Sequence, residues 1–322
     1  MTERHPGKLV TLLGGSGFIG RYVVQELARR GWRIRVAVRR PDLAGHLRPL
    51  GSVGQIQAVQ ANLRYPESVD AAVQHADVVV NLVGILAASG RQTFNAVQAF
   101  GSRAAAEAAR AAGAGRFVQM SAIGADLDSR SEYARTKAEG EAVVRETIAD
   151  AVIVRPSIVF GAEDQFFNRF AAMAKLSPVL PIVGADTRFQ PVFAGDVADF
   201  VAAAVDGNVA GGTTYELGGP DVKTFRELIE LMLKEIRRKR LIAPLPFWVA
   251  ALQARMMSVL PNAPLTVDQV RLLKRDNVVS EAAIRDGRTF AAAAITPHSL
   301  AAILPTYLWR YRPGGQFAPP QN

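Results

Sequence analysis

The first half of the chain alternates short apolar runs with alanine-rich stretches of helical periodicity. The near-continuous apolar runs are Leu9–Leu13, Ile34–Val38, Ile56–Gln60, Val78–Leu82, Phe117–Met120 and Val152–Val154. Such runs are typical of strands that are buried on both faces of a sheet. Helices are predicted between them over Phe18–Arg30, Phe100–Ala112 and Tyr133–Thr147. Strand–helix alternation with right-handed crossovers predicts an α/β fold with a doubly wound parallel sheet.

The second half is less regular. Helical periodicity is found over Asp164–Leu176, Gly195–Val205 and Thr224–Arg240, a short strand is predicted at Thr214–Leu217, and an apolar, proline-flanked stretch follows at Leu241–Pro261. We therefore expect a nucleotide-binding domain over residues 1–160, to which a segment at about 192–217 returns. Residues 161–191 and 218–322 are expected to form a smaller, mainly helical C-terminal domain.

Composition narrows the classes of function. The 322 residues include no cysteine and four histidines, which excludes thiolate chemistry and argues against a histidine zinc site. Lysine and arginine number 38 against 29 acidic residues, and this net charge of +9 predicts an anionic partner: nucleic acid, a phosphate-bearing cofactor or an acidic membrane surface. The first residues lack the pattern of a signal peptide, so we expect a cytoplasmic protein.

A glycine motif joins the first predicted strand to the first predicted helix. It reads Gly14-Gly15-Ser16-Gly17-Phe18-Ile19-Gly20. Gly14 would permit a tight turn, Gly17 would let the backbone approach a pyrophosphate, and Gly20 would let the helix pack closely on the strand. A glycine-rich turn in another α/β fold is the alternative, but the strand-to-helix context favours a Rossmann-type dinucleotide site.

The end of the second predicted strand bears on the choice of cofactor. An NAD site usually has an acidic residue there for the ribose 2′-hydroxyl, whereas this chain has Arg39 and Arg40. Guanidinium groups can donate paired hydrogen bonds to a 2′-phosphate, so we predict NADPH (NADP) as the cofactor. The alternative is that both arginines are solvated surface residues.

Tyr133 and Lys137 form a Y-x-x-x-K spacing at the start of a predicted helix. The two side chains would share one helix face, where a cation can lower the pKa of a phenol. With the glycine motif, this pair resembles the short-chain dehydrogenase/reductase superfamily, in its extended or atypical branch. The resemblance implies a Ser or Thr after the fifth strand, a position that falls on Ser121 or Ala122 depending on register.

The same resemblance implies further contacts to the cofactor. Asn62 and Leu63 would approach the adenine, although the superfamily usually has Asp at the first of these positions. Two further segments resemble the superfamily: Asn81-Leu82-Val83-Gly84 after the fourth strand and Arg155-Pro156-Ser157-Ile158 after the sixth. The implied cofactor-binding residues are Gly14, Ser16, Gly17, Phe18, Ile19, Gly20, Arg39, Arg40, Asn62, Leu63, Val83, Gly84, Ser121, Tyr133, Lys137, Pro156 and Ile158. Ser121, Tyr133 and Lys137 are the catalytic candidates, and no metal site is expected.

A finer resemblance covers nearly the whole chain. It is carried by the strings RPSIVFGAEDQFFNRF at 155–170, DTRFQPV at 186–192, YELGGP at 215–220, DNVVS at 276–280 and LPTYLWR at 304–310. These resemble the nucleotide-binding accessory subunit family of respiratory complex I (NADH:ubiquinone oxidoreductase), in its bacterial form. The resemblance implies NADPH held without turnover in a protein docked near the quinone-binding arm, on the cytoplasmic face of the inner membrane.

The positive charge is concentrated late in the sequence. Residues 232–275 contain nine lysines and arginines and two acidic residues, or +7 of the total of +9. The cluster Arg237–Arg240 precedes the apolar stretch, where Pro244, Pro246 and Arg255 argue against a membrane span. A basic cluster beside a Trp-bearing apolar helix predicts contact with an anionic membrane surface. A basic surface helix followed by a buried packing helix is the alternative.

Two other functions remain open from the sequence. One is a free NADP-dependent reductase, epimerase or steroid-type dehydrogenase that uses Tyr133 and Lys137. The other is a redox-sensing regulator that contacts nucleic acid. Because nucleic-acid grooves tend to pair basic residues with stacking aromatics, and here the cluster has an apolar neighbour, we expect no nucleic-acid partner.

Overall fold

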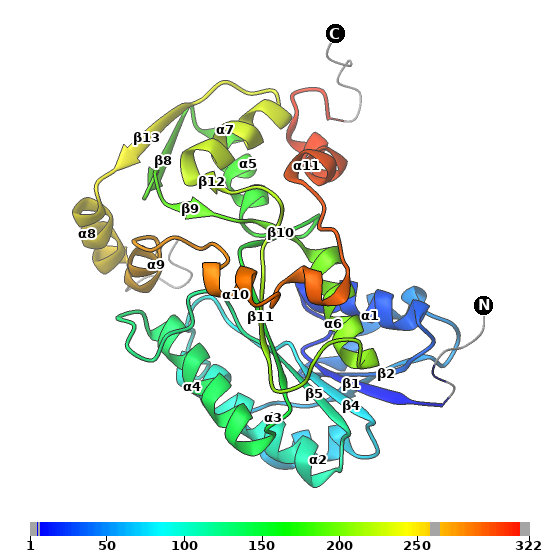
Figure 1. Ribbon diagram of the computed structural model, residues 1–322. Helices are drawn as coiled ribbons and strands as arrows, with labels where there is room; N and C mark the ends of the chain where they lie inside the picture. The colour runs from blue at the N-terminus through cyan, green and yellow to red at the C-terminus, as the bar shows by residue number, and fades with distance from the viewer. Residues whose placement is uncertain (1–4, 6, 258–264, 316–322) are drawn as a thin grey trace. The chain divides into compact units, whose positions relative to one another are not determined.

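The computed structural model describes residues 5, 7–257 and 265–315, and the chain divides into two compact units (Figure 1). The first unit comprises Met1–Pro156, Ala194–Leu217 and Ser280–Thr296. The second comprises Ser157–Phe193, Gly218–Val279 and Pro297–Asn322. The polar end of the tail, residues 316–322, lies outside the described residues.

The first unit contains a seven-stranded parallel sheet with the order β11-β6-β5-β4-β1-β2-β3. Its strands are β1 (Leu9–Leu13), β2 (Arg33–Val38), β3 (Ile56–Gln60), β4 (Val78–Asn81), β5 (Arg116–Met120), β6 (Val152–Pro156) and β11 (Thr214–Leu217). Leu12 on the interior strand β1 is fully buried and is in register with Val36 on one side and Val80 on the other. The predicted Rossmann-type α/β fold is confirmed.

Helices cover both faces of this sheet. They are α1 (Phe18–Arg29), η1 (Pro41–Leu50), α2 (Pro66–Val73), η2 (Asn95–Ala99), α3 (Phe100–Ala111), α4 (Glu132–Thr147), α6 (Ala194–Asp206), α10 (Glu281–Arg285) and η3 (Phe290–Ala293). Figure 1 shows α2, α3 and α4 on one face, and α1 and α6 on the other. Small alanines let α3 lie close to the sheet and to α4, and let α6 lie close to the sheet and to α1, as the buried Ala105, Ala109 and Ala202 show.

Residues Ser280–Thr296 belong to the first unit, whereas the sequence had placed them with the C-terminal domain. The backbone N–H of Ser280 donates a hydrogen bond to the Glu216 carboxylate. The ring of Phe290 packs edge-on against Phe200 of α6. These contacts join positions far apart in the sequence, so no local sequence pattern predicts them.

The second unit is built around an aromatic core. Its elements are β7 (Val159–Phe160), α5 (Phe167–Leu176), β8 (Val179–Val183), β9 (Arg188–Phe189), β10 (Val192–Phe193), β12 (Lys223–Thr224), α7 (Phe225–Glu235), β13 (Leu241–Leu245), α8 (Phe247–Met257), α9 (Val267–Leu272), α11 (Leu300–Leu308) and η4 (Trp309–Tyr311). Phe166, Phe167 and Phe170 belong to one aromatic cluster with Phe189 and Phe225.

Two elements of this unit differ from the expectation. Helix α7 is capped by the reciprocal hydrogen bonds of Thr224 and Glu227, but it ends at Glu235, so the Arg237–Arg240 cluster follows the helix instead of lying on it. The apolar stretch that follows is not one helix, because its first residues form β13, which pairs in parallel with β8. Proline disfavours the interior of an α-helix, and α8 starts only at Phe247, after Pro244 and Pro246.

Candidate functional site

The glycine motif forms a tight turn between β1 and α1. Gly14 has φ +81, a conformation that favours glycine, and its N–H donates to the carbonyl of Ala37 at the end of β2. A Cβ on Gly14 would lie 2.9 Å from Val83 Cγ2, and one on Gly20 would lie 2.6 Å from the backbone of Gly15. The predicted roles of Gly14 and Gly20 in turning and close packing therefore match the geometry.

The start of α1 is open to an anion. Gly17 is the N-cap and has no side chain to accept hydrogen bonds from the first turn, and that turn contains no acidic residue. Ser16, Phe18 and Ile19 are each partly exposed around it. Unpaired N–H groups and the positive end of the helix dipole suit a pyrophosphate. These residues fit the diphosphate of a dinucleotide.

The two arginines after β2 differ from each other. The guanidinium of Arg40 donates to both carboxylate oxygens of Asp42, at 2.7 and 2.9 Å for the closest pairs, and these hydrogen bonds hold the pKa of Asp42 below its usual range. Arg39 is exposed and makes no hydrogen bond or ion pair to another described residue. Arg39 is therefore the arginine available to a ribose phosphate, and Asp42 competes for Arg40.

The loops after β3 and β4 bring further predicted residues to this edge of the sheet. Asn62 accepts a hydrogen bond from the N–H of Arg64, while Leu63 is buried against Gly101. Val83 lies beside Gly14, and a Cβ on Gly84 would lie 3.2 Å from the Lys137 ammonium nitrogen. The structure thus brings the glycine turn, the β4 loop and the start of α4 together.

The Tyr133/Lys137 pair lies in the first turns of α4. Lys137 is buried, and its Nζ donates to the carbonyl of Met120, 3.2 Å away, at the end of β5. Burial lowers the pKa of Lys137 to about 8, opposed in part by the charge of Glu141. Desolvation also raises the pKa of Tyr133 to about 12, and its ring packs edge-on against Phe94. In this structure, therefore, the phenol is not activated toward ionisation.

Ser121 is engaged by a carboxylate that sequence reasoning missed. Its Oγ donates to Oε1 of Glu141 at 2.5 Å, and the guanidinium of Arg155 binds both oxygens of the same carboxylate at 2.8 and 2.6 Å. Ser121 and Glu141 are both buried. The signal in the sequence was the position of Glu141 four residues after Lys137, which places an acid on the sheet-facing side of α4.

The last two predicted residues fall in different units. Pro156 ends β6 in the first unit. Ile158 belongs to the second unit, where its N–H donates to the side-chain oxygen of Asn277. The predicted cofactor role of Ile158 stays a prediction.

The described part of the chain has neither a cluster of metal ligands nor a membrane-spanning helix. No group of histidine, aspartate and glutamate there could hold a metal ion. Within the same residues, no helix is long and apolar enough to cross a membrane.

The family model for the NAD dependent epimerase/dehydratase family matches residues 10–218. The NADH dehydrogenase [ubiquinone] 1 alpha subcomplex subunit 9 of Arabidopsis thaliana mitochondria is 34% identical, with 96% of this chain and 79% of that protein covered. A ceramide reductase of Caulobacter vibrioides is 38% identical over 59% of this chain and 58% of its own length.

The fold has matching solved structures. An NADPH-dependent quinone oxidoreductase from Escherichia coli, solved with NADPH, superposes with a TM-score of 0.72 at 19% identity, covering 93% of this chain and 98% of that one. The glycine turn, the open start of α1 and the match to the family model agree on a nicotinamide dinucleotide as the cofactor class. The chain belongs to the NAD dependent epimerase/dehydratase family, in a group of relatives that includes subunits of mitochondrial NADH dehydrogenase.

Proposed function

We propose that this protein is an accessory subunit of membrane-bound NADH:ubiquinone oxidoreductase (complex I) that holds NADPH without turning it over. The observation that carries the proposal is the 34% identity to a mitochondrial complex I subunit across 96% of this chain. In this proposal the first unit holds the dinucleotide, and the second unit docks on other complex I subunits near the quinone-binding arm.

The choice of NADPH rests on the end of β2. Arg39 is exposed and is not engaged by an acidic residue of the described chain, so its guanidinium can bind a 2′-phosphate. Arg39→Asp would replace that donor with a repelling carboxylate. We expect it to weaken NADPH binding by at least about tenfold while leaving NADH binding within about twofold. Equal NADPH affinity in the two proteins would refute the assignment.

Three side chains support binding without turnover. The proton of the Ser121 hydroxyl is donated to Glu141, so it is not offered to a substrate oxygen. Burial raises the pKa of the Tyr133 phenol to about 12, so the phenol stays protonated at neutral pH. The Lys137 ammonium donates its hydrogen bond to the Met120 carbonyl. When bound, the dinucleotide would supply hydride chemistry, but this arrangement favours retention of the cofactor.

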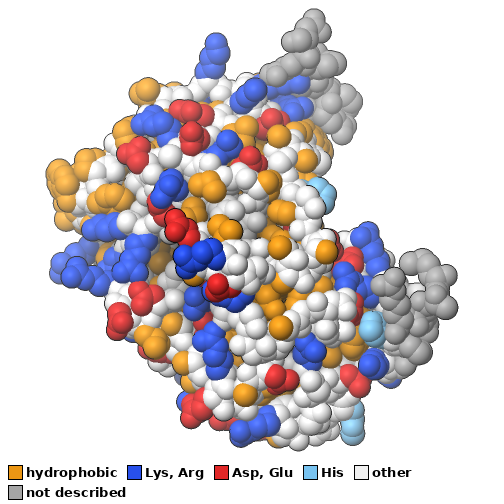
Figure 2. All heavy atoms as spheres, viewed as in Figure 1, with side chains coloured by type: hydrophobic (Ala, Val, Ile, Leu, Met, Phe, Trp, Pro, Cys, Tyr) orange, Lys and Arg blue, Asp and Glu red, His pale blue; other side chains and the backbone are white. Residues whose placement is uncertain are grey.

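We propose a peripheral position on the cytoplasmic face of the inner membrane, and the second unit has a surface suited to contact with a membrane. Trp248, Leu252 and Met256 recur every four residues on α8 and are 72%, 55% and 72% exposed, while Ala250 and Ala254 face the core. Figure 2 shows apolar side chains gathered at α8, with lysines and arginines beside them. An apolar stripe edged by cations suits an anionic membrane surface.

The Arg237–Arg240 cluster does not lie next to α8. The five residues of β13 separate the two, a distance of about 17 Å along an extended strand. The membrane contact we propose therefore has two parts, the basic cluster at one end of β13 and the apolar helix at the other.

The test is affinity purification of the tagged chain from solubilised membranes, with identification of the nucleotide it carries. We expect complex I subunits and stoichiometric NADPH that is not oxidised by added carbonyl compounds. Tyr133→Phe is the matched control, because removal of the hydroxyl should leave copurification intact. Recovery of the chain without complex I subunits would overturn the proposal.

A free NADP-dependent reductase is the second candidate, favoured by the 38% identity to a ceramide reductase. In that case Tyr133 would donate the proton and Lys137 would assist. Carbonyl-dependent oxidation of NADPH that is lost in Tyr133→Phe would support this candidate over the first.

A further inference from the structure

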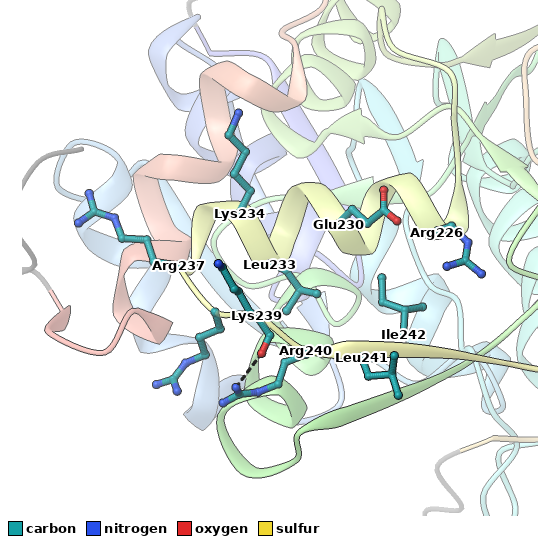
Figure 3. A pocket seen from close by; sticks show the side chains of 10 residues that line it. Arg226, Glu230, Leu233, Lys234, Arg237, Lys239, Arg240, Leu241 and Ile242 are labelled. Atoms are coloured by element: carbon teal, nitrogen blue, oxygen red, sulfur yellow. Dashed lines mark hydrogen bonds between the residues drawn. The ribbon is translucent and has the colours of Figure 1, made fainter. Parts of the chain in front are cut away.

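The second unit contains a groove of about 660 Å³ between α7 and the start of β13 (Figure 3). Six of the residues that line it are cationic, one is acidic and three are apolar. They are Arg226, Lys234, Arg237, Arg238, Lys239 and Arg240, then Glu230, then Leu233, Leu241 and Ile242. The lining therefore carries a net charge of +5, which calls for an anionic ligand.

Within the described chain, no carboxylate forms a hydrogen bond or ion pair with four of these cations, Lys234, Arg238, Lys239 and Arg240. Arg238 donates to the backbone carbonyl of Tyr311, and Arg240 donates to the carbonyls of Ala174 and Lys239. Carbonyl oxygens fix the guanidinium groups in place but leave their charge intact. Lys234 and Lys239 are exposed and make no side-chain hydrogen bond or ion pair within the described chain.

The backbone is bent to make this arrangement. Arg237 has φ +54, a left-handed conformation that costs a non-glycine residue energy, at the position where a helix normally ends on glycine or asparagine. The turn is closed by hydrogen bonds from the N–H groups of Arg237 and Arg238 to the carbonyls of Lys234 and Leu233. It places the basic residues after α7 around the groove.

An apolar strip runs between the cations. Figure 3 shows Leu233, Leu241 and Ile242 in the middle of the groove, with Arg226 at one end and Lys239 and Arg240 at the other. Leu241 is 66% exposed. Leu233 is buried beneath it and Ile242 is half-buried. Cations alone would suit a free phosphate, whereas an apolar surface at Leu241 and Ile242 between the cations suits a ligand that has both a phosphate and a hydrocarbon part.

We propose that this groove binds an acidic phospholipid, with the phosphate among the cations and the adjoining hydrocarbon against Leu241 and Ile242. The inference deepens the membrane-facing part of the proposed function. It does not depend on a bound dinucleotide or on the association with complex I.

The test uses the purified full chain and vesicles of phosphatidylcholine, with or without equimolar phosphatidylglycerol. We expect binding to the phosphatidylglycerol vesicles alone, weakened at least about 30-fold in Lys234→Glu/Lys239→Glu, since each surface cation contributes about fivefold. Arg110→Glu/Arg285→Glu is the control, because it changes the net charge equally on exposed helical positions of the first unit.

The control double variant should bind vesicles within about threefold of the unchanged protein, and all proteins should bind NADPH equally. Equal weakening by the two double variants would overturn a discrete site in favour of general charge.

The variant Leu241→Ser distinguishes a lipid phosphate from a free phosphate as the ligand. It should weaken vesicle binding about tenfold and leave the binding of inorganic pyrophosphate unchanged. Tight pyrophosphate binding without vesicle binding would overturn the lipid assignment. Since vesicle binding and copurification with complex I are separate readouts, failure of this inference is distinguishable from failure of the proposed function.

Discussion

The dinucleotide end of the sheet and the basic groove both have the features of phosphate sites, but they are built in opposite ways. The dinucleotide end depends on the absence of side chains at Gly14, Gly17 and Gly20 and on the buried hydrogen bonds around Glu141. The groove uses long side chains whose charges add. A site defined by shape should fail at a single substitution, whereas a site defined by summed charge should weaken step by step.

The same contrast holds between lysines. Lys137 is buried, and desolvation lowers its pKa to about 8. Lys234 and Lys239 are exposed, so water stabilises their charge whether or not a ligand is present. Burial removes the ammonium of Lys137 from water, and the Met120 carbonyl and the Glu141 carboxylate nearby partly compensate for the lost hydration.

The largest effect is expected for Glu141→Ala. It would leave Ser121 and Arg155 without their shared buried partner, and we expect the free energy of unfolding to fall by about 3–4 kcal/mol in chemical denaturation. Glu146→Ala, at an exposed position of the same helix, should change stability by no more than about 0.5 kcal/mol. Similar losses of unfolding free energy in both variants would show that the buried network around Glu141 does not stabilise the fold.

Gly20→Ala should be nearly as severe. The added Cβ would lie 2.6 Å from the Gly15 backbone, and overpacking of this kind costs about 2–3 kcal/mol. We expect NADPH binding in fluorescence titration to be lost along with stability. Gly45→Ala is the control, since nothing lies within 4 Å of the Cβ position there. Normal cofactor binding by Gly20→Ala would contradict a cradle set by shape.

The depressed pKa of Lys137 predicts a pH dependence. Between about pH 8 and the usual lysine value of 10.5, the unfolded chain binds a proton that the folded chain has lost, so stability rises with pH in that window. From pH 7.5 to 9.5 the gain is about 2 kcal/mol, relative to Lys137→Met, which has no group to titrate. Parallel pH profiles for the two proteins would show that Lys137 titrates normally.

The smallest effect is expected in the groove. Lys239→Ala should weaken binding to phosphatidylglycerol vesicles by about fivefold and change the free energy of unfolding by less than about 0.5 kcal/mol. The measurements are vesicle sedimentation and thermal unfolding. Complete loss of vesicle binding from this one change would mean that the groove, too, depends on a precise arrangement.

Much of the first unit could be predicted because its signals are local. Five of the six apolar runs became largely buried strands, whereas Ile56–Gln60 became the partly exposed edge strand β3. The glycine motif lies at the predicted turn between β1 and α1. Glu141 escaped prediction because its role depends on Ser121 and Arg155, which the sheet brings to it from other strands. Arg40 was predicted as a phosphate ligand, but Asp42, two residues later, holds its guanidinium in this structure.

The second unit was harder to predict for a related reason. The apolar stretch after Arg240 has the composition of a helix, yet Leu241–Leu245 pairs with β8, some sixty residues earlier. Pro244 and Pro246 indicate that a helix cannot run through this segment, but only its pairing with β8 shows that it is a strand. Similarly, Ser280–Thr296 returns to the first unit through contacts with Glu216 and Phe200 that no periodicity records.

The division of the chain has a consequence for its modularity. Each unit is made of three separate segments, so the backbone passes from one unit to the other five times. No single cut releases either unit whole, and a premature stop before Ser280 would remove part of both. A fragment that ends at residue 160 would lack both β11, the strand at one edge of the sheet, and every residue of the basic groove.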